Sequence, residues 1–357
     1  MKNTAAVSYI RQLCCLGLGG HIIMPELLRA LHAFIPSASN MFYWADENYQ
    51  MSNVYCENSD LYILQSLYFQ EFYNSKEVQV TKLGFSEAMR IGRGWGNTER
   101  MGPEFASSEL FNELWRPNDI RCGIEATIWE NGRGFGSIVL TRGPGEKPFS
   151  DVEEMSLRSL IPYLAHGLRG TRDLRGEMAP SGESGTLIVD SQDKIVQFCP
   201  EGKRLLLLAM HFGRIARDSP SLDSPAIKRL CVNLRGILRG RPQPVPMLRQ
   251  PHALGEFIFR AYPLGSDGQP NGSIAVTIER HEPLPLKLMR NMGTLPLTAR
   301  QREVCLLLSY GYSHSMIAPR MYVSKHTVTD YVRKIYDKLD VNGHEQLMKK
   351  LVAITMH

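Results

Sequence analysis

The sequence predicts a multidomain protein in which two α+β modules, each an antiparallel sheet with flanking helices, precede an all-α unit. Its 357 residues exceed one typical core, because domains usually hold about 100 to 200 residues. Strand and hairpin signals alternate with amphipathic helical patterns up to residue 282. After residue 296 only helical periodicity remains, in four segments separated by capping and turn residues.

Composition and charge are those of a folded protein with a mild basic excess. Hydrophobic residues make up 43% of the chain and charged residues 22%, and the formal net charge is +5. No apolar run approaches the ~18 residues that a membrane span needs. The N-terminal stretch also lacks a signal-peptide cleavage pattern. We therefore expect a cytoplasmic protein that does not enter a membrane.

The sequence offers no catalytic or metal-binding motif. The seven cysteines form no C-x-x-C or zinc-type spacing, so we expect reduced structural thiols, with a redox role for Cys14 and Cys15 as the alternative. The glycine-rich stretch IGRGWGNTERMG, residues 91–102, matches neither G-x-G-x-x-G nor a P-loop. We expect no enzyme activity, no metal and no evident cofactor.

The first module shows a helix, a hairpin and a closing helix. Residues 24–35, MPELLRALHAFI, have apolar residues at helical spacing. Two strand-like runs then flank Asn131-Gly132, and Asn-Gly favours a type I′ hairpin turn because both central residues need positive φ. Residues 150–170 predict one helix, capped by Ser150 with Glu153 as its capping-box partner.

The middle module repeats that order on a smaller scale. Residues 185–209 predict strand, turn, strand and helix, and residues 255–279 predict a second hairpin. Between them, residues 225–246 predict a basic amphipathic helix followed by a proline-rich loop. We expect the cations of this stretch to form a solvated face, with contact to an anion as the alternative; they are Lys228, Arg229, Arg235, Arg239 and Arg241.

Two stretches rich in glycine, serine or proline predict linkers, at residues 173–185 and 283–296. They divide the chain into domains at 1–172, 186–282 and 297–357.

In the terminal domain, capping or turn residues stand at every predicted helix junction. Thr298 with Gln301 predicts the start of the first helix, and Gly311 predicts its end. Ser313 begins a short second helix, and a turn near Tyr322 precedes Ser324, the expected cap of the third. A short helix, a tight turn and a longer helix are the spacing of a helix-turn-helix unit.

The third helix has an apolar side and a polar side. We expect four residues on its inner stripe: Val328, Val332, Ile335 and Leu339. Between residues 294 and 357, nine Lys or Arg residues against five Asp or Glu residues give a charge of +4. Most of the chain's positive excess therefore lies in its last sixth, which favours a polyanionic partner.

This terminal segment resembles the DNA-binding domain of LuxR/GerE-type transcription regulators. The resemblance rests on LTARQREV, GYSHSMIA and SKHTVTDYVRKIYDKLDV, over about 60 residues. It implies base-reading positions at Thr329, Asp330 and Arg333, and contacts with the DNA backbone at Ser324, Thr327 and Lys338. The family's usual lysine is replaced here by Thr329 and its usual histidine by Tyr331.

With the residues that face outward or lie at the helix N-terminus, the expected DNA-contact set is Ser324, Lys325, His326, Thr327, Thr329, Asp330, Arg333, Lys334 and Lys338. Asp330 brings a negative charge to a surface that is expected to meet phosphate, unless it accepts from a cytosine amino group.

The domain at 1–172 resembles a GAF-like sensor domain, and the domain at 186–282 is similar, more weakly, to a PAS domain. Both folds hold small ligands against a sheet, so an unidentified small-molecule effector is expected as a partner. Aromatic residues able to line such a pocket are Phe42, Tyr43, Trp44, Tyr55, Trp95, Trp115 and Trp129, although core packing is an alternative use. A phosphorylated receiver domain is not expected, because parallel βα alternation is absent.

Together these features predict a transcription regulator whose sensor domains control a C-terminal helix-turn-helix. Its expected partners are double-stranded DNA, a second copy of the chain in a homodimer, and RNA polymerase. Two alternatives remain: a protein-docking regulator without productive DNA binding, and an autoinducer-binding quorum-sensing regulator.

Overall fold

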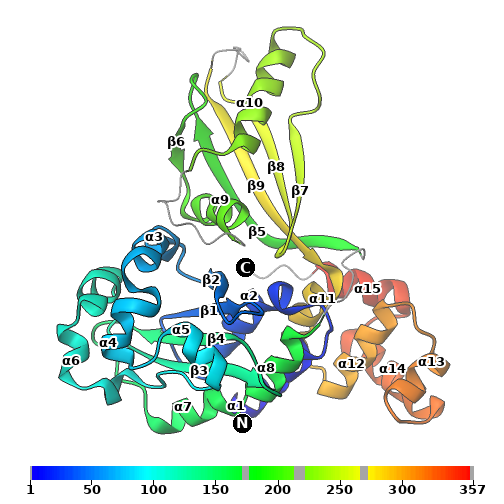
Figure 1. The fold of residues 1–357 in the computed structure, drawn as a ribbon. Coiled ribbons are helices and arrows are strands. Elements are labelled where there is room, and N and C mark those ends of the chain that lie inside the picture. The colour runs from blue at the N-terminus through cyan, green and yellow to red at the C-terminus, as the bar shows by residue number, and fades with distance from the viewer. Residues whose placement is uncertain (1, 171–176, 213–221, 266–271, 354–357) are drawn as a thin grey trace. The chain divides into compact units, whose positions relative to one another are not determined.

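The computed structural model describes residues 2–170, 177–212, 222–265 and 272–353. The chain divides into two compact units. Their helices and strands are labelled in Figure 1. The front unit comprises Met1–Arg172 and Glu183–Arg280, and the C-terminal unit comprises Asp173–Gly182 and His281–His357. Among the described residues, no helix is both long enough and apolar enough to cross a membrane.

The first module of the front unit is built on a four-stranded antiparallel sheet of order β2-β1-β4-β3. Asn131 and Gly132 join β3 to β4 with φ values of 51° and 81°, which confirms the predicted hairpin turn. The strands and larger helices are α1 Lys2–Cys14, α2 Gly20–Leu31, β1 Ser39–Ala45, β2 Met51–Cys56, β3 Cys122–Glu130, β4 Arg133–Arg142, α7 Asp151–Arg158 and α8 Ile161–Leu168.

Successive residues of a strand point to opposite faces of its sheet, and here the two faces have different neighbours. Trp44 of β1 faces α2, where its ring lies 4.7 Å from that of His21. Helices α1, α2 and α8 pack together on this side. The opposite face, which carries Tyr43, is covered by short helical segments: η1 Ser59–Tyr62, α3 Gln65–Leu67, η2 Tyr68–Lys76, α4 Glu77–Thr81, α5 Phe85–Ile91, η3 Thr98–Met101, α6 Pro103–Ser107, η4 Leu110–Trp115 and η5 Arg116–Asn118.

The helix expected at 150–170 begins as predicted but is two helices. The Ser150 side chain accepts from the Glu153 amide, and the Glu153 side chain accepts from the Ser150 amide, so the capping box is confirmed. The chain then breaks between α7 and α8. Pro162 lies in the first turn of α8, where its missing N–H costs nothing, whereas it would remove a bond from the middle of one continuous helix.

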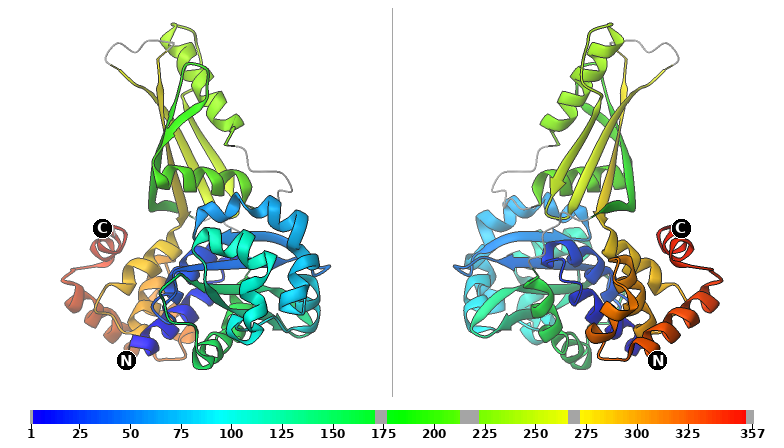
Figure 2. Two further views of the ribbon diagram at one scale, coloured as in Figure 1. Left: turned by 90° about the vertical axis from the view of Figure 1, so that its left-hand side faces the viewer. Right: turned by 90° about the vertical axis from the view of Figure 1, so that its right-hand side faces the viewer.

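The middle module holds a five-stranded sheet of order β6-β5-β9-β8-β7. Helix α10 lies against β7 and β8 (Figure 2). The elements are β5 Met178–Val189, β6 Ile195–Phe198, α9 Pro200–His211, α10 Pro225–Leu238, β7 Met247–His252, β8 Gly255–Pro263 and β9 Ile274–Pro283. Arg235 of α10 was expected on a solvated face, but it is buried. It bonds Asp193 and the Asp190 carbonyl.

The linker expected at 173–185 is corrected, because β5 begins at Met178; residues 173–176 of that prediction lie outside the described residues. Gly185 was taken as a sign of flexibility, yet a Cβ there would overlap the backbone of Gly202, so this glycine permits close packing. The part of β5 that pairs with β6 begins at Leu187, and Pro180 lies before it.

Most of the segment at 283–296, which was expected to be an irregular linker, forms α11 Leu284–Gly293. Pro283 is the N-cap of this helix and Pro285 lies in its first turn, so neither proline interrupts it. Leu286, Leu288, Met289 and Met292 are buried in the C-terminal unit. The remaining helices of that unit are α12 Ala299–Ser309, α13 His314–Arg320, α14 Lys325–Leu339 and α15 His344–Ala353.

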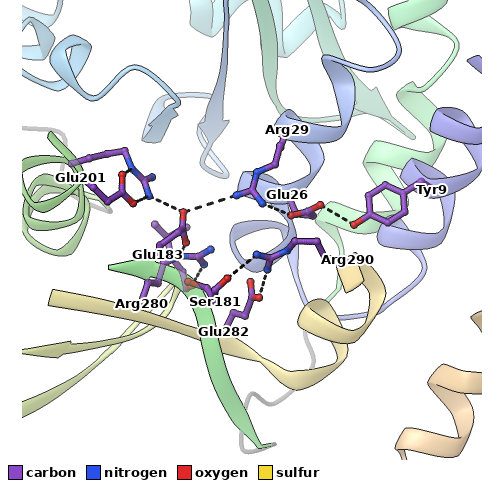
Figure 3. Close-up of polar contacts among 11 residues, drawn as sticks. Tyr9, Glu26, Arg29, Ser181, Glu183, Glu201, Arg280, Glu282 and Arg290 are labelled. Carbon is purple, nitrogen blue, oxygen red and sulfur yellow. Dashed lines mark hydrogen bonds and ion pairs between the residues drawn. The ribbon is translucent and has the colours of Figure 1, made fainter. Parts of the chain in front are cut away.

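Buried charges on β5 and β9 are paired within each unit (Figure 3). In the front unit Glu183 accepts from Arg280 and Arg204. In the C-terminal unit Arg290 of α11 donates to Glu282 and to the Ser181 carbonyl. Glu282 is fully buried and Arg290 is 7% exposed, so their pair is screened little by water.

We predict that Arg290→Met destabilises the C-terminal unit by about 3 to 5 kcal/mol, because it leaves the Glu282 carboxylate buried without its guanidinium. Urea denaturation followed by circular dichroism measures the change. Arg300→Met is the matched control: its pair with Glu303 is exposed, with side chains 57% and 41% accessible, and we expect little change. Equal stability of the two variants would contradict the prediction.

Candidate functional site

The candidate DNA interface is built on three helices of the C-terminal unit. Thr298 and Gln301 form the capping box that begins α12, as the sequence predicted. Val304, Cys305 and Leu308 of α12 are buried. Gly311 follows the helix with a φ of 77°, a conformation that glycine adopts without strain. These features fix the helix against which α14 packs.

The turn between α13 and α14 brings the two helices into contact. Tyr322 adopts a φ of 55° in this turn and is 95% exposed. The Val323 amide bonds the Ala318 carbonyl at 3.0 Å, which closes the turn. Pro319 lies next to the end of the short α13, so its effect is limited to the last turn.

Helix α14 begins at the predicted cap. The Ser324 hydroxyl accepts from the Thr327 amide at 3.1 Å and also bonds the Thr327 hydroxyl at 2.8 Å. Ser313, by contrast, occupies the N-cap of α13 without a side-chain cap bond. The four residues of the predicted inner stripe are all buried: Val328, Val332, Ile335 and Leu339.

The opposite side of α14 carries an exposed ridge formed by His326, Asp330, Arg333 and Lys334, which we call the outer ridge. Arg333 donates to Asp330 at 3.0 Å, with side chains 69% and 35% exposed. His326 lies 3.6 Å from the other Asp330 oxygen. The aspartate therefore partly neutralises the arginine that the sequence favours for base contact. Lys334 has no hydrogen-bond or ion-pair partner among the described residues.

The flanks of α14 contact the other helices. Thr329 lies on one flank, where its hydroxyl is 3.3 Å from His314 Nδ1 of α13 and also donates to the Lys325 carbonyl. Thr329 remains exposed, so this contact orients the hydroxyl without covering it. Lys325, one turn earlier, is exposed at the N-terminal end of α14.

Lys338, for which a phosphate contact was expected, makes two hydrogen bonds within the C-terminal unit. Its ammonium group donates to the Pro296 carbonyl and to Gln301 Oε1, each at 2.9 Å. It thus ties the C-terminal half of α14 to the start of α12. Sequence spacing did not reveal this role, because the partners lie 42 and 37 residues away.

A second feature is a partly open cavity of about 150 Å³ in the first module. Of the seven aromatic residues expected to line a pocket, Tyr43, Trp95 and Trp115 do so. Phe42 and Trp44 do not, because they point to the other face of β1. Tyr55 and Trp129 are also not among the lining residues.

Two carboxylates in the cavity wall, Glu77 and Glu125, were missed by sequence reasoning. Glu125 could have been noticed, because it is a charged residue in the buried middle of strand β3. One glycine of the stretch at 91–102 is explained by the same carboxylate. A Cβ at Gly94 would overlap the Glu125 carboxyl group, and the Trp95 amide donates to it at 2.6 Å. The glycine therefore lets the backbone approach an internal anion.

Comparison with known proteins identifies the C-terminal helices. Residues 295–351 match the family described as "Bacterial regulatory proteins, luxR family". No curated protein gives a significant match to the chain. One similar solved structure is the "Sensor region of a sensor histidine kinase", at 13% identity and a TM-score of 0.19; the match covers 44% of this chain and 63% of that chain. This chain thus spans less than two thirds of that structure's length, and the likeness carries no argument about the fold.

The capped α12, the α13–turn–α14 geometry and the family match all fall on the same segment. Residues 295–351 are therefore a luxR-family regulatory domain.

Proposed function

We propose that the chain is a DNA-binding transcription regulator in which α14 is the recognition helix. The observation that carries this proposal is the outer ridge of α14, exposed opposite the buried stripe and adjoining Lys325 at the helix N-terminus. A helix held by α12 and α13 with its polar side free has the geometry that enters a major groove. The luxR-family match over residues 295–351 supports the assignment.

The residues of this face divide into two roles. Arg333 presents a planar fork of donors that matches O6 and N7 of guanine. Lys325 and Lys334 suit phosphates, and Ser324 and Thr327 lie beside the unpaired N–H groups at the start of α14. Thr329 and Asp330 complete the proposed base-reading set, with Asp330 able to accept from a cytosine amino group.

We further propose that the front unit is the sensor, with a GAF-like module at 1–172 and a PAS-like module in the five-stranded sheet. Two sheets with flanking helices and a partly open cavity support this division. Strand β9 runs directly into α11, which precedes α12. A signal in the front unit would act along this path on a homodimer that binds a two-fold-related site.

A docking regulator without productive DNA contacts is the second candidate. The Asp330–Arg333 ion pair and the internal bonds of Lys338 favour it, because they reduce the charge available to phosphate. Substitutions on the outer ridge separate the two candidates.

We predict that Arg333→Ala weakens binding to a DNA fragment selected by the full-length protein by roughly 5- to 150-fold, because one bidentate base contact is lost. Fluorescence anisotropy at fixed salt measures the affinity. Lys349→Ala is the matched control, since it removes one positive charge from an exposed ion pair on α15. Failure of the wild-type chain to select DNA, or equal affinities for the two variants, would favour the docking candidate.

We predict that Asp330→Asn tightens binding to unrelated duplexes several-fold, because Arg333 is released and one negative charge is removed from the DNA-facing side. The slope of log affinity against log salt should also steepen by about 0.9, the value for one added phosphate contact. Glu345→Gln is the control, as it opens the Lys349 pair on α15 instead. An unchanged affinity and slope would show that Asp330 does not face DNA.

A further inference from the structure

The cavity of the first module lies between one face of the four-stranded sheet and the helical segments that cover it. Met41 and Tyr43 of β1, Glu125 of β3 and Val139 of β4 form the sheet side of its wall. Gln65 of α3 contributes from the covering segments. Because all these residues belong to one module, the cavity does not depend on the placement of any other part of the chain.

Glu125 is an acceptor fixed in this wall. Its side chain accepts from the Ser137 hydroxyl and from the Trp95 amide. Burial nevertheless raises the pKa of Glu125 above its ordinary value, against the lowering effect of these hydrogen bonds, and the charge of Glu77 adds to the rise.

Glu77 is held in the same way on the covering side. It accepts from the Tyr68 hydroxyl at 2.7 Å and from the amides of Asn74 and Phe85 at 2.8 and 3.2 Å. Burial raises the pKa of Glu77 as well. Two carboxyl groups in one cavity wall thus carry an electrostatic cost that a bound cation would remove.

Within the described part of the chain, no lysine, arginine or histidine lines the cavity. The wall therefore offers negative charge and acceptors, with no positive group to meet an anion. An anionic ligand would be repelled by the carboxylates and would lose its hydration without compensation.

Gln65 is a second, independent sign of a ligand. Its residue is only 9% exposed, it lines the cavity, and its side-chain amide has no hydrogen-bond partner among the described residues. Its amide atoms keep accessible surface, so a ligand that enters the cavity can bond them. The Tyr43 hydroxyl also has a weak partner, because it donates to the sulfur of Met41 at 3.3 Å.

The rest of the wall suits a cation on an apolar body. The rings of Tyr43, Trp95 and Trp115 line the cavity, and the last two lie 6.1 Å apart between centroids. Aromatic faces attract ammonium groups, most strongly where water is excluded. A cavity of about 150 Å³ has the size that holds a benzene ring.

We propose that this cavity binds a small organic amine in its protonated form, with the ammonium group between Glu77 and Glu125 and an aromatic or branched apolar body against the tryptophans. Gln65 bonds a polar substituent or the ammonium itself. This proposal does not rest on DNA binding, and its test uses no DNA.

Titration calorimetry on the full chain compares three probes of nearly equal size: phenethylamine, phenethyl alcohol and phenylacetate. We expect phenethylamine to bind, phenethyl alcohol to bind about tenfold or more weakly because a charge-assisted bond is lost, and phenylacetate not to bind. Quenching of tryptophan fluorescence by phenethylamine reports occupancy beside Trp95 and Trp115.

The variants Glu125→Gln and Glu77→Gln keep the shape of the side chain and remove its charge, and each should weaken phenethylamine about tenfold or more while leaving phenethyl alcohol unchanged. The matched control is Glu87→Gln, which lies on α5 in an exposed pair with Arg90 and should bind as the wild type does. If a cavity variant does not fold, the three-probe comparison on the wild-type chain still decides.

Three results would overturn the proposal: no binding of phenethylamine, equal affinities for the amine and the alcohol, or preferred binding of phenylacetate.

Discussion

The strands β5 and β9 carry buried charges, and the need to pair them constrains the rest of the fold. Burial acts to raise the pKa of Glu183, but Arg280 and Arg204 hold it below its ordinary value, so the carboxylate stays charged within the front unit. Two residues along each strand from that pair, Ser181 and Glu282 bond Arg290 in the C-terminal unit. A shift of register by one residue would set these charges against apolar side chains. The pairing of β5 with β9 therefore fixes the partners of Glu183 and of Glu282. It also fixes where α11 begins, because β9 leads directly into that helix.

Local signals in the sequence predicted local structure well. The Asn131-Gly132 turn, the capping boxes at Ser150 and Thr298 and the cap at Ser324 depend on a few adjacent residues, and each was found as expected. The linkers failed for a physical reason. Proline and glycine were read as breaks, whereas Pro283 and Pro285 begin a helix, where a proline is tolerated.

The features that sequence could not predict depend on contacts between distant residues. The bonds of Lys338 to Pro296 and Gln301 require α14 to be packed on α12. Glu77 and Glu125 line one cavity only because a segment without regular periodicity covers the sheet. The outer ridge of α14 was predictable because helical spacing fixes its faces, but its internal ion pair was not anticipated. Asp330 was noted only for the sign of its charge.

The pairing of Arg333 with Asp330 bears on how such a helix would find its site in a genome. Affinity for random DNA comes almost wholly from cations that displace counterions from phosphates. A guanidinium neutralised by its own helix adds little to that affinity until a guanine edge replaces the aspartate. In the recognition role that we propose for α14, residence on wrong sequences would be shorter while the correct contact is kept, so the many competing sites of a chromosome would hold fewer copies of the protein.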